Sequence, residues 1–193
     1  MRDISLLLCY NRAMNVCFIG HRTVEDVEQL KIRLTETIER LIADGADTFL
    51  FGSRSAFDTL CWQVVTELQT QYPHIKRVSY NAPYESAITS REERQQLEQI
   101  SSKLLGSEVQ LKDYEVAVDS LKSKNATKDT YIMRNQEMID DCDICVFYYN
   151  KDYLPPRRKR SKRNVLDYQP RSGTAVAFSY AMQKKKIIIN LYK

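Results

Sequence analysis

Three short turns in the sequence each combine glycine with a basic residue and a hydroxyl-bearing residue. They read Gly20-His21-Arg22-Thr23, Gly52-Ser53-Arg54-Ser55 and Arg171-Ser172-Gly173-Thr174. Glycine lets a ligand approach the backbone closely, and an arginine guanidinium can pair with a phosphate through two parallel N–H bonds. Free backbone N–H groups at the start of a helix also favour anions. The three turns therefore predict a site for a phosphate or another anion.

Two side chains in or beside these turns have both a functional and a structural explanation. His21 suits proton transfer near neutral pH. It also suits a hydrogen bond to a backbone carbonyl in its turn, and we favour this structural role. Asp58 falls in the first turn of an expected helix, where a carboxylate stabilises free N–H groups. A hydrogen bond between Asp58 and a ribose hydroxyl is an equally good interpretation.

The five cysteines, an odd number, favour a reduced cytoplasmic protein over a disulfide-bonded one. Cys17 and Cys145 fall in apolar, strand-like segments, where a thiol behaves as a small hydrophobic group. Cys142 and Cys145 have the spacing of half a redox or zinc motif, but the sequence has no second pair of this kind. Only His21 and His74 could add further ligands, so we expect no metal site.

One basic cluster dominates the charge distribution, and without it the chain is net acidic although its formal net charge is +4. Its members are Arg157, Arg158, Lys159, Arg160, Lys162 and Arg163. A solvated loop is the simpler interpretation. The alternative is a module that binds nucleic-acid phosphates through Arg157, Arg158, Lys159 and Arg160. Tyrosines that could stack on the bases of a single strand flank the cluster: Tyr148, Tyr149, Tyr153 and Tyr168.

The elements that position these residues follow from the pattern of apolar residues. Apolar runs alternate with segments of helical period, which is typical of a parallel α/β sheet. Strands are expected at residues 16–20, 48–52, 75–80, 143–149 and 186–191. Helices are expected from Thr23 to Gly45 and at residues 55–70, 91–105, 131–140 and 172–182. Residues 106–126 give mixed signals.

The strand-to-helix turns of a parallel sheet share its carboxyl edge, so Gly20, Gly52 and Gly173 are expected to meet there. We therefore predict a three-layer α/β, Rossmann-like fold with a mainly parallel central sheet of five or more strands. Residues 14–193 are predicted to form a single domain with an exposed basic loop at 150–169. Residues 1–13 are predicted to be a loosely attached extension or to precede a functional start at Met14.

Composition excludes several classes of protein. Of the 193 residues, 43% are hydrophobic and 28% are charged, which excludes a wholly disordered, collagen-like or mucin-like chain. The apolar runs fall far short of the roughly 20 residues that a membrane-spanning helix requires. No small-residue cleavage site follows the N-terminal apolar stretch. We therefore expect a soluble globule with neither a membrane span nor a secretory signal.

The turns also carry a family resemblance. Residues 17–22, 51–58, 134–143 and 172–174 resemble the SLOG superfamily, a Rossmann-like group that includes the LOG proteins and the DNA-processing protein DprA. The similarity is greatest to its YspA-like bacterial branch of poorly defined function, and it extends over residues 15–191. It implies a pocket for a nucleotide or nucleotide-derived ligand and, since many relatives form dimers, a homodimer. No further cofactor is expected.

The resemblance also suggests which residues line the pocket. It implies Gly20, Arg22, Gly52, Ser53, Asp58, Arg134, Gly173 and Thr174. The turns add the neighbouring side chains His21, Arg54 and Ser172. Arg134 also has a structural explanation, which is an ion pair with Glu137 or Asp140 on its own helix.

This chain departs from the LOG enzymes at one catalytic position. By family resemblance, these enzymes cleave the N-glycosidic bond of nucleoside 5′-monophosphates with an arginine before the fourth strand and a glutamate after the Gly-Thr turn. Arg134 matches the arginine, but residues 175–178 contain no carboxylate. The reaction therefore needs Asp58 or Asp140 as a substitute.

The turns themselves also differ from the family pattern. Family members tend to have two adjacent glycines where this chain has Gly52-Ser53, and a Gly-Gly-x-Gly-Thr turn where it has Arg171-Ser172-Gly173-Thr174. Hydroxyl groups thus replace bare backbone in the expected phosphate cradle. We expect a protein that binds or senses a nucleotide-derived ligand. The N-glycosidase and the nucleic-acid-binding module are the alternatives.

Overall fold

A six-stranded sheet forms the centre of the molecule in the computed structural model, which describes residues 14–52, 55–81, 115–119, 128–154 and 172–193. The strands lie in the order β4-β3-β2-β1-β5-β6, and every neighbouring pair is parallel. Their bounds are Met14–Gly20 (β1), Ala46–Phe51 (β2), Lys76–Asn81 (β3), Glu115–Asp119 (β4), Ile144–Tyr148 (β5) and Ile187–Asn190 (β6). The predicted parallel sheet is confirmed.

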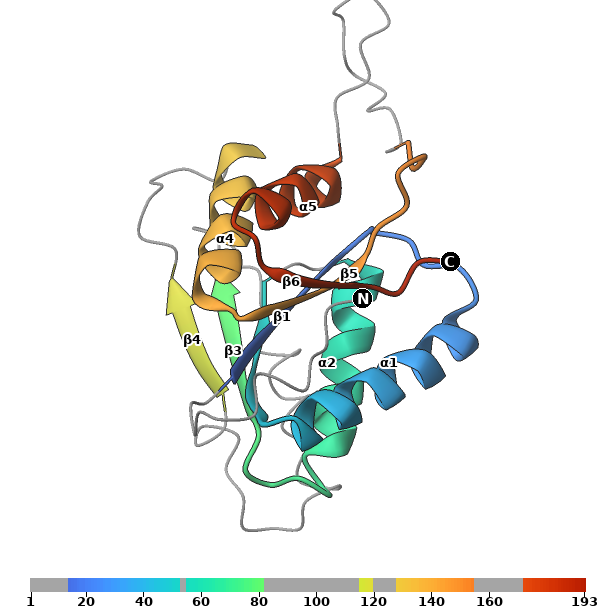
Figure 1. The fold of residues 1–193 in the computed structure, drawn as a ribbon, viewed down its shortest axis with the longest axis vertical. Coiled ribbons are helices and arrows are strands. Elements are labelled where there is room, and N and C mark those ends of the chain that lie inside the picture. Colours follow the sequence, from blue (N-terminus) through green and yellow to red (C-terminus); the bar gives the residue numbers. More distant parts are fainter. Residues whose placement is uncertain (1–13, 53–54, 82–114, 120–127, 155–171) are drawn as a thin grey trace, which may run out of the picture.

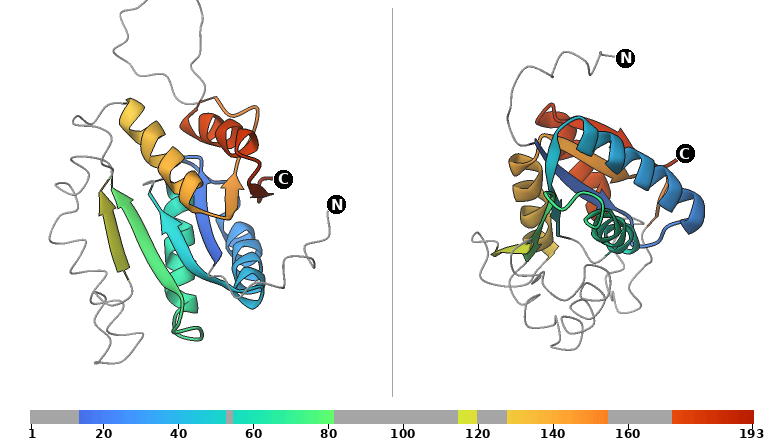
Figure 2. Two further views of the ribbon diagram at one scale, coloured as in Figure 1. Left: turned by 60° about the vertical axis from the view of Figure 1, so that its left-hand side comes forward. Right: turned by 90° about the horizontal axis from the view of Figure 1, so that it is seen from below.

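Helices cover both faces of the sheet, which gives the three predicted layers (Figures 1 and 2). The helices α1 (Val27–Ala43) and α2 (Ala56–Leu68) lie against one face, and α4 (Lys128–Asp141) and α5 (Gly173–Gln183) lie against the other. Among the described residues, no helix has both the length and the apolar character needed to cross a membrane.

The strand β1 shows why the central strands are apolar throughout. Val16 and Phe18 belong to the core under α1 and α2, while Cys17 and Ile19 belong to the core under α4 and α5. All four side chains are at most 2% exposed. A strand covered on both faces loses the alternation of polar and apolar residues, so a short apolar run is the sequence signal for it.

The order of the strands reverses between β1 and β5. From β1 the chain adds β2, β3 and β4 on one side, and it then returns to place β5 and β6 on the other side of β1. The chain leaves β1 toward α1 on one face and leaves β5 toward α5 on the opposite face. In open α/β sheets ligands bind in the crevice at the carboxyl ends of the strands where the order reverses.

The start of α1 differs from the prediction. A capped start at Thr23 was expected, but α1 begins at Val27. Its N-cap residue Asp26 has a left-handed backbone (φ 47°) and makes no side-chain capping hydrogen bond. The Glu25 N–H instead donates to the Tyr148 hydroxyl at 3.1 Å, which ties the segment before α1 to β5. This tertiary contact replaces the local cap.

Several other expectations fall outside the described residues or differ from the structure. The strand β4 lies within residues 106–126, where the sequence signals were mixed. The helix expected at residues 91–105, the extension at residues 1–13 and the basic cluster at Arg157–Arg163 lie outside the described residues.

Candidate functional site

The three glycine-containing turns meet at the carboxyl edge of the sheet, as predicted. The Ala56 N–H donates to the Arg22 carbonyl at 3.2 Å, which joins the turn after β2 to the turn after β1. The Thr174 hydroxyl donates to the Gly20 carbonyl at 3.0 Å, which joins the start of α5 to the end of β1. The predicted neighbours Ser53 and Arg54 lie outside the described residues.

The hydroxyl groups of the turns hold the turns themselves. Ser55 Oγ accepts a hydrogen bond from the Asp58 N–H at 3.1 Å, and Ser172 Oγ accepts one from the Ala175 N–H at 3.1 Å. Both serines are thus N-caps, of α2 and α5 respectively. Thr174 is buried, and its hydroxyl bonds to β1. The hydroxyls of Ser55, Ser172 and Thr174 therefore have partners within the protein.

The glycines of the three turns have different surroundings. A Cβ at Gly20 would overlap the Phe57 side chain of α2, and a Cβ at Gly52 would overlap Met138 Sδ of α4. Gly173 is exposed, and no described atom outside its immediate neighbours comes within 4 Å of a Cβ built there. Close packing thus explains Gly20 and Gly52, whereas packing leaves Gly173 unexplained.

Arg134 lies buried beside the turn that follows β2. Its side chain is 2% exposed, and its Nε would lie 3.1 Å from a Cβ at Gly52. Its Nη2 donates to Asn135 Oδ1 at 3.3 Å, and its guanidinium carbon lies 5.3 Å from the centre of the Tyr131 ring. The helix α4 therefore delivers a buried cation to the same edge of the sheet as the three turns.

The two carboxylates that could replace the missing glutamate lie in different places. Asp58 is buried in the first turn of α2, at the carboxyl edge. Asp140 lies in the last turn of α4, which leads into the amino end of β5. Its Oδ1 pairs with Lys184 Nζ at 2.8 Å, and its carboxylate accepts a hydrogen bond from the Tyr180 hydroxyl. Of the two, only Asp58 is on the edge that carries the turns.

His21 has a structural role at this edge. Its side chain is 2% exposed, and its Nε2 lies 2.9 Å from the Asn150 N and 3.3 Å from the Asn150 carbonyl oxygen, the kind of backbone contact that was expected. The ring also stacks on Tyr153 with a centroid distance of 4.0 Å. Burial lowers the pKa of His21 below its usual value, although the contact with the Asn150 backbone acts in the opposite direction.

The tyrosines that were considered as a stacking platform for nucleic acid pack within the domain. Each has an aromatic neighbour: Tyr148 stacks on Phe57, Tyr149 on Phe178 and Tyr153 on His21. Tyr168 lies outside the described residues, as do Arg157, Arg158, Lys159 and Arg160. The described tyrosines therefore contribute to the packing of the carboxyl edge.

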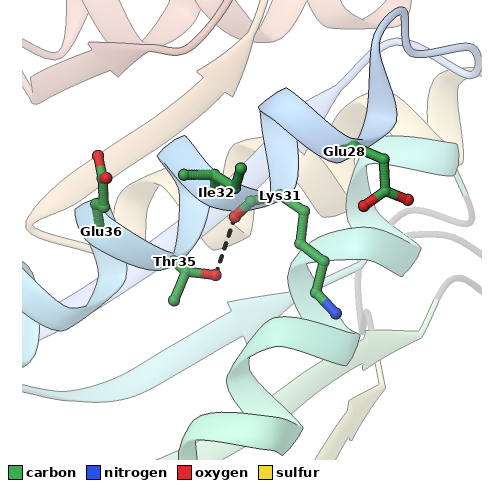
Figure 3. A pocket seen from close by; sticks show the side chains of 5 residues that line it. All are labelled: Glu28, Lys31, Ile32, Thr35 and Glu36. Carbon is green, nitrogen blue, oxygen red and sulfur yellow. Dashed lines mark hydrogen bonds between the residues drawn. The ribbon is translucent and has the colours of Figure 1, made fainter.

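A separate hollow of about 270 Å³ lies on the outer side of α1 (Figure 3). It is lined by Glu28, Lys31, Ile32, Thr35 and Glu36. None of these residues belongs to the predicted site. Lys31 also pairs with Glu67 of α2 at 2.9 Å. The hollow is thus a surface feature of α1.

Comparison with known families agrees with the geometry of this edge. The sequence profile of the YspA SLOG family matches residues 11–179, which include all three turns and Arg134. The chain belongs to the YspA SLOG family. No curated protein matches it. The resemblance inferred from the turns is therefore confirmed.

Proposed function

We propose that this YspA SLOG protein binds a nucleotide or nucleotide-derived ligand at the carboxyl edge of its sheet. The observation that carries the proposal is Arg134, a buried guanidinium placed beside Gly52 at an edge where three strand-to-helix turns converge. Arginine suits a ligand phosphate at this edge because its guanidinium can pair with a phosphate through two parallel N–H bonds.

The start of α5 supplies the second part of the proposed anion site. Ser172 caps the Ala175 N–H, and the Gly173 and Thr174 N–H groups belong to the same first turn, in which Gly173 is exposed and Thr174 is buried. The first turn of α5 contains no acidic residue that would offset the positive end of the helix dipole. The exposed, uncrowded side of Gly173 lets a phosphate approach these N–H groups.

A thermal-shift panel of nucleoside phosphates, cyclic nucleotides, NAD and ADP-ribose tests the proposal. We expect at least one compound to stabilise the wild-type protein, by about 2.7 kcal/mol at 100 times its Kd. Arg134→Lys keeps the charge but loses the guanidinium fork, so it should weaken binding at least about tenfold. Arg77→Lys is the matched control, because Arg77 is also buried (1% exposed) but contacts Thr66 and Trp62 of α2.

Two outcomes of this panel contradict the proposal. In the first, no compound raises the melting temperature of the wild-type protein. In the second, Arg134→Lys and Arg77→Lys weaken binding to the same extent, which would show that the loss follows from reduced stability rather than from a lost contact.

Hydrolysis of the N-glycosidic bond of a nucleoside 5′-monophosphate is a second candidate function, and the position of Asp58 favours it. Asp58 is a buried carboxylate at the same edge as Arg134, where it could stabilise a developing ribosyl cation. The assay measures free base released from nucleoside monophosphates by the wild type and by Asp58→Asn. Release that Asp58→Asn abolishes would establish the enzyme. Unchanged substrate after prolonged incubation leaves the protein as a binding protein.

A further inference from the structure

Three buried thiols meet in the core beneath α4 and α5. The Sγ atoms of Cys17, Cys142 and Cys145 all lie within 4.8 Å of one another. Cys142 Sγ is 3.3 Å from Cys17 Sγ and 3.4 Å from Cys145 Sγ. The three residues are at most 2% exposed. The cluster is therefore compact and shielded from solvent.

The sheet register creates this cluster. Cys17 of β1 and Cys145 of β5 are direct partners in neighbouring parallel strands, so their side chains project from the same face. Cys142 follows the end of α4 and brings a third thiol over that face. The sequence-based expectation of no metal site rested on the missing second cysteine pair. The fold supplies one further thiol from a strand 125 residues away from Cys142.

We propose that Cys17, Cys142 and Cys145 bind one Cu(I) ion through three thiolates. Thiolates are soft ligands that select Cu(I) or zinc among the common metal ions. Structural zinc sites are closed by four ligands. Within the described residues, no histidine, carboxylate or fourth cysteine joins the cluster. A three-coordinate sulfur site matches Cu(I), which is stable with three ligands.

The surroundings also favour an ion that needs no water as a further ligand. The core around the thiols is apolar and includes Ile19, Leu50, Ile139, Phe147, Ala177 and Ala181. With a sulfur–metal bond of about 2.3 Å, three sulfurs around a central ion lie about 4 Å apart. To hold the ion, the sulfur of Cys142 and the sulfurs of Cys17 and Cys145 therefore need to move apart by only roughly a few tenths of an ångström each.

A nearby cation partly balances the charge of the thiolates. Lys186 Nζ donates to the Cys142 carbonyl at 2.5 Å and to the Asp140 carbonyl at 3.0 Å. The binding of Cu(I) by the three thiols releases their protons to solvent.

This site is separate from the proposed nucleotide site. Cys145 is the second residue of β5, and Cys142 precedes that strand, so the cluster lies toward its amino end. The three turns and Arg134 lie at the opposite, carboxyl edge. Failure of one proposal therefore leaves the other intact.

An anaerobic competition titration of the reduced full-length protein with Cu(I) and the chelator bicinchoninate tests the copper site. We expect one Cu(I) per chain, with X-ray absorption showing a first shell of three sulfurs. Each of Cys17→Ala, Cys142→Ala and Cys145→Ala should weaken binding at least about tenfold and leave two sulfurs in the shell. Cys61→Ala is the matched control, because Cys61 is equally buried but packs on the opposite face of the sheet. Cys9→Ala controls for the remaining cysteine.

Several outcomes would overturn the copper site. They are no stoichiometric binding by the wild type, binding that the three cluster variants leave unchanged, and a loss that Cys61→Ala or Cys9→Ala shares. Tighter binding of Zn²⁺ than of Cu(I) would also reject the assignment. If circular dichroism shows that a cluster variant is unfolded, the number of sulfur ligands in the wild-type copper complex tests the proposal instead. Nitrogen or oxygen ligands in place of the three sulfurs would contradict it.

Discussion

The turns after β1 and β2 differ from the turn that opens α5 in what lies beside their glycines. Gly20 and Gly52 face side chains of helices, Phe57 and Met138, that leave no room for a Cβ. Gly173 is exposed and has no such neighbour among the described residues. The three turns look alike in the sequence, yet helix packing accounts for the glycine in two of them.

This difference separates residues that build the carboxyl edge from residues available to a ligand. Ser55, Ser172 and Thr174 hold the turns through hydrogen bonds within the protein. The proposed ligand contacts are Arg134 and the first N–H groups of α5. Substitutions of residues that hold the turns and of residues proposed to contact the ligand should therefore have different effects on stability and affinity.

Gly20→Ala should give the largest loss of stability. The new methyl group would overlap Phe57 close to its backbone, where the side chain cannot swing away. Overpacking of this kind costs about 3 kcal/mol, at the upper end of its usual range. Urea denaturation followed by circular dichroism measures the change. In the double variant with Phe57→Ala, the two losses should sum to more than the measured total. Strict additivity would show that the Gly20–Phe57 contact is not the cause.

Gly52→Ala should cost less, about 1–2 kcal/mol. The overlapping atom is the sulfur of Met138, a flexible side chain that can adopt another rotamer. The displaced neighbours include Arg134, so Gly52→Ala should also weaken nucleotide binding, measured by calorimetry. A variant that loses stability but keeps full affinity would show that the position of Arg134 does not matter for the ligand.

Much of the fold was predictable because the central strands are buried on both faces. The run at residues 16–20 lies within β1 (Met14–Gly20), and the expected strand at residues 143–149 contains β5 (Ile144–Tyr148). Local sequence patterns gave the wrong start for α1, because a tertiary contact determines where that helix begins. The Tyr148 hydroxyl holds the Glu25 N–H, so α1 starts at Val27 and not at Thr23.

The site was predictable in its location but not in the roles of its residues. Glycines mark turns in any sequence, so the three turns could be assigned to one edge before the structure was known. Packing against Phe57 and Met138 explains two of these glycines. No pattern in the sequence predicts that these two helix side chains contact the turns. The same holds for Cys17, which only the pairing of β1 with β5 brings to Cys142 and Cys145.

Loss of either serine cap should have an intermediate effect. Ser55→Ala and Ser172→Ala each remove an N-cap hydrogen bond, at a cost of about 1 kcal/mol. Urea denaturation of both variants measures this cost, and Ser55→Thr and Ser172→Thr serve as controls that keep a hydroxyl. If Ser172→Ala changed ligand affinity without changing stability, its hydroxyl would belong to the ligand site and not to the helix cap.

The pH dependence of stability should report His21. Burial lowers its pKa in the folded protein, while the unfolded chain titrates near about 6.5. The unfolded state therefore binds the proton first as the pH falls, so stability should decrease from about pH 6.5 downward until the folded-state pKa is passed. His21→Gln should remove this part of the dependence, and His74→Gln, at an exposed position, should retain it. Urea denaturation at a series of pH values provides the measurement, and equal curves for the two variants would contradict the assignment.

Gly173→Ala should have the smallest effect on stability and is the sharpest test of the comparison. Gly173 does not have a positive φ, and a methyl group there meets no described atom within 4 Å. Alanine at such a position restricts the unfolded chain, so stability should stay equal or rise by up to about 1 kcal/mol. A phosphate bound against the first N–H groups of α5 would nevertheless meet the new methyl group. We therefore expect nucleotide affinity to fall at least about tenfold, which corresponds to about 1.4 kcal/mol. Denaturation and calorimetry on the same preparation separate the two effects. Unchanged affinity in a stable Gly173→Ala protein would remove the start of α5 from the ligand site and leave Arg134 as the anchor of the proposal.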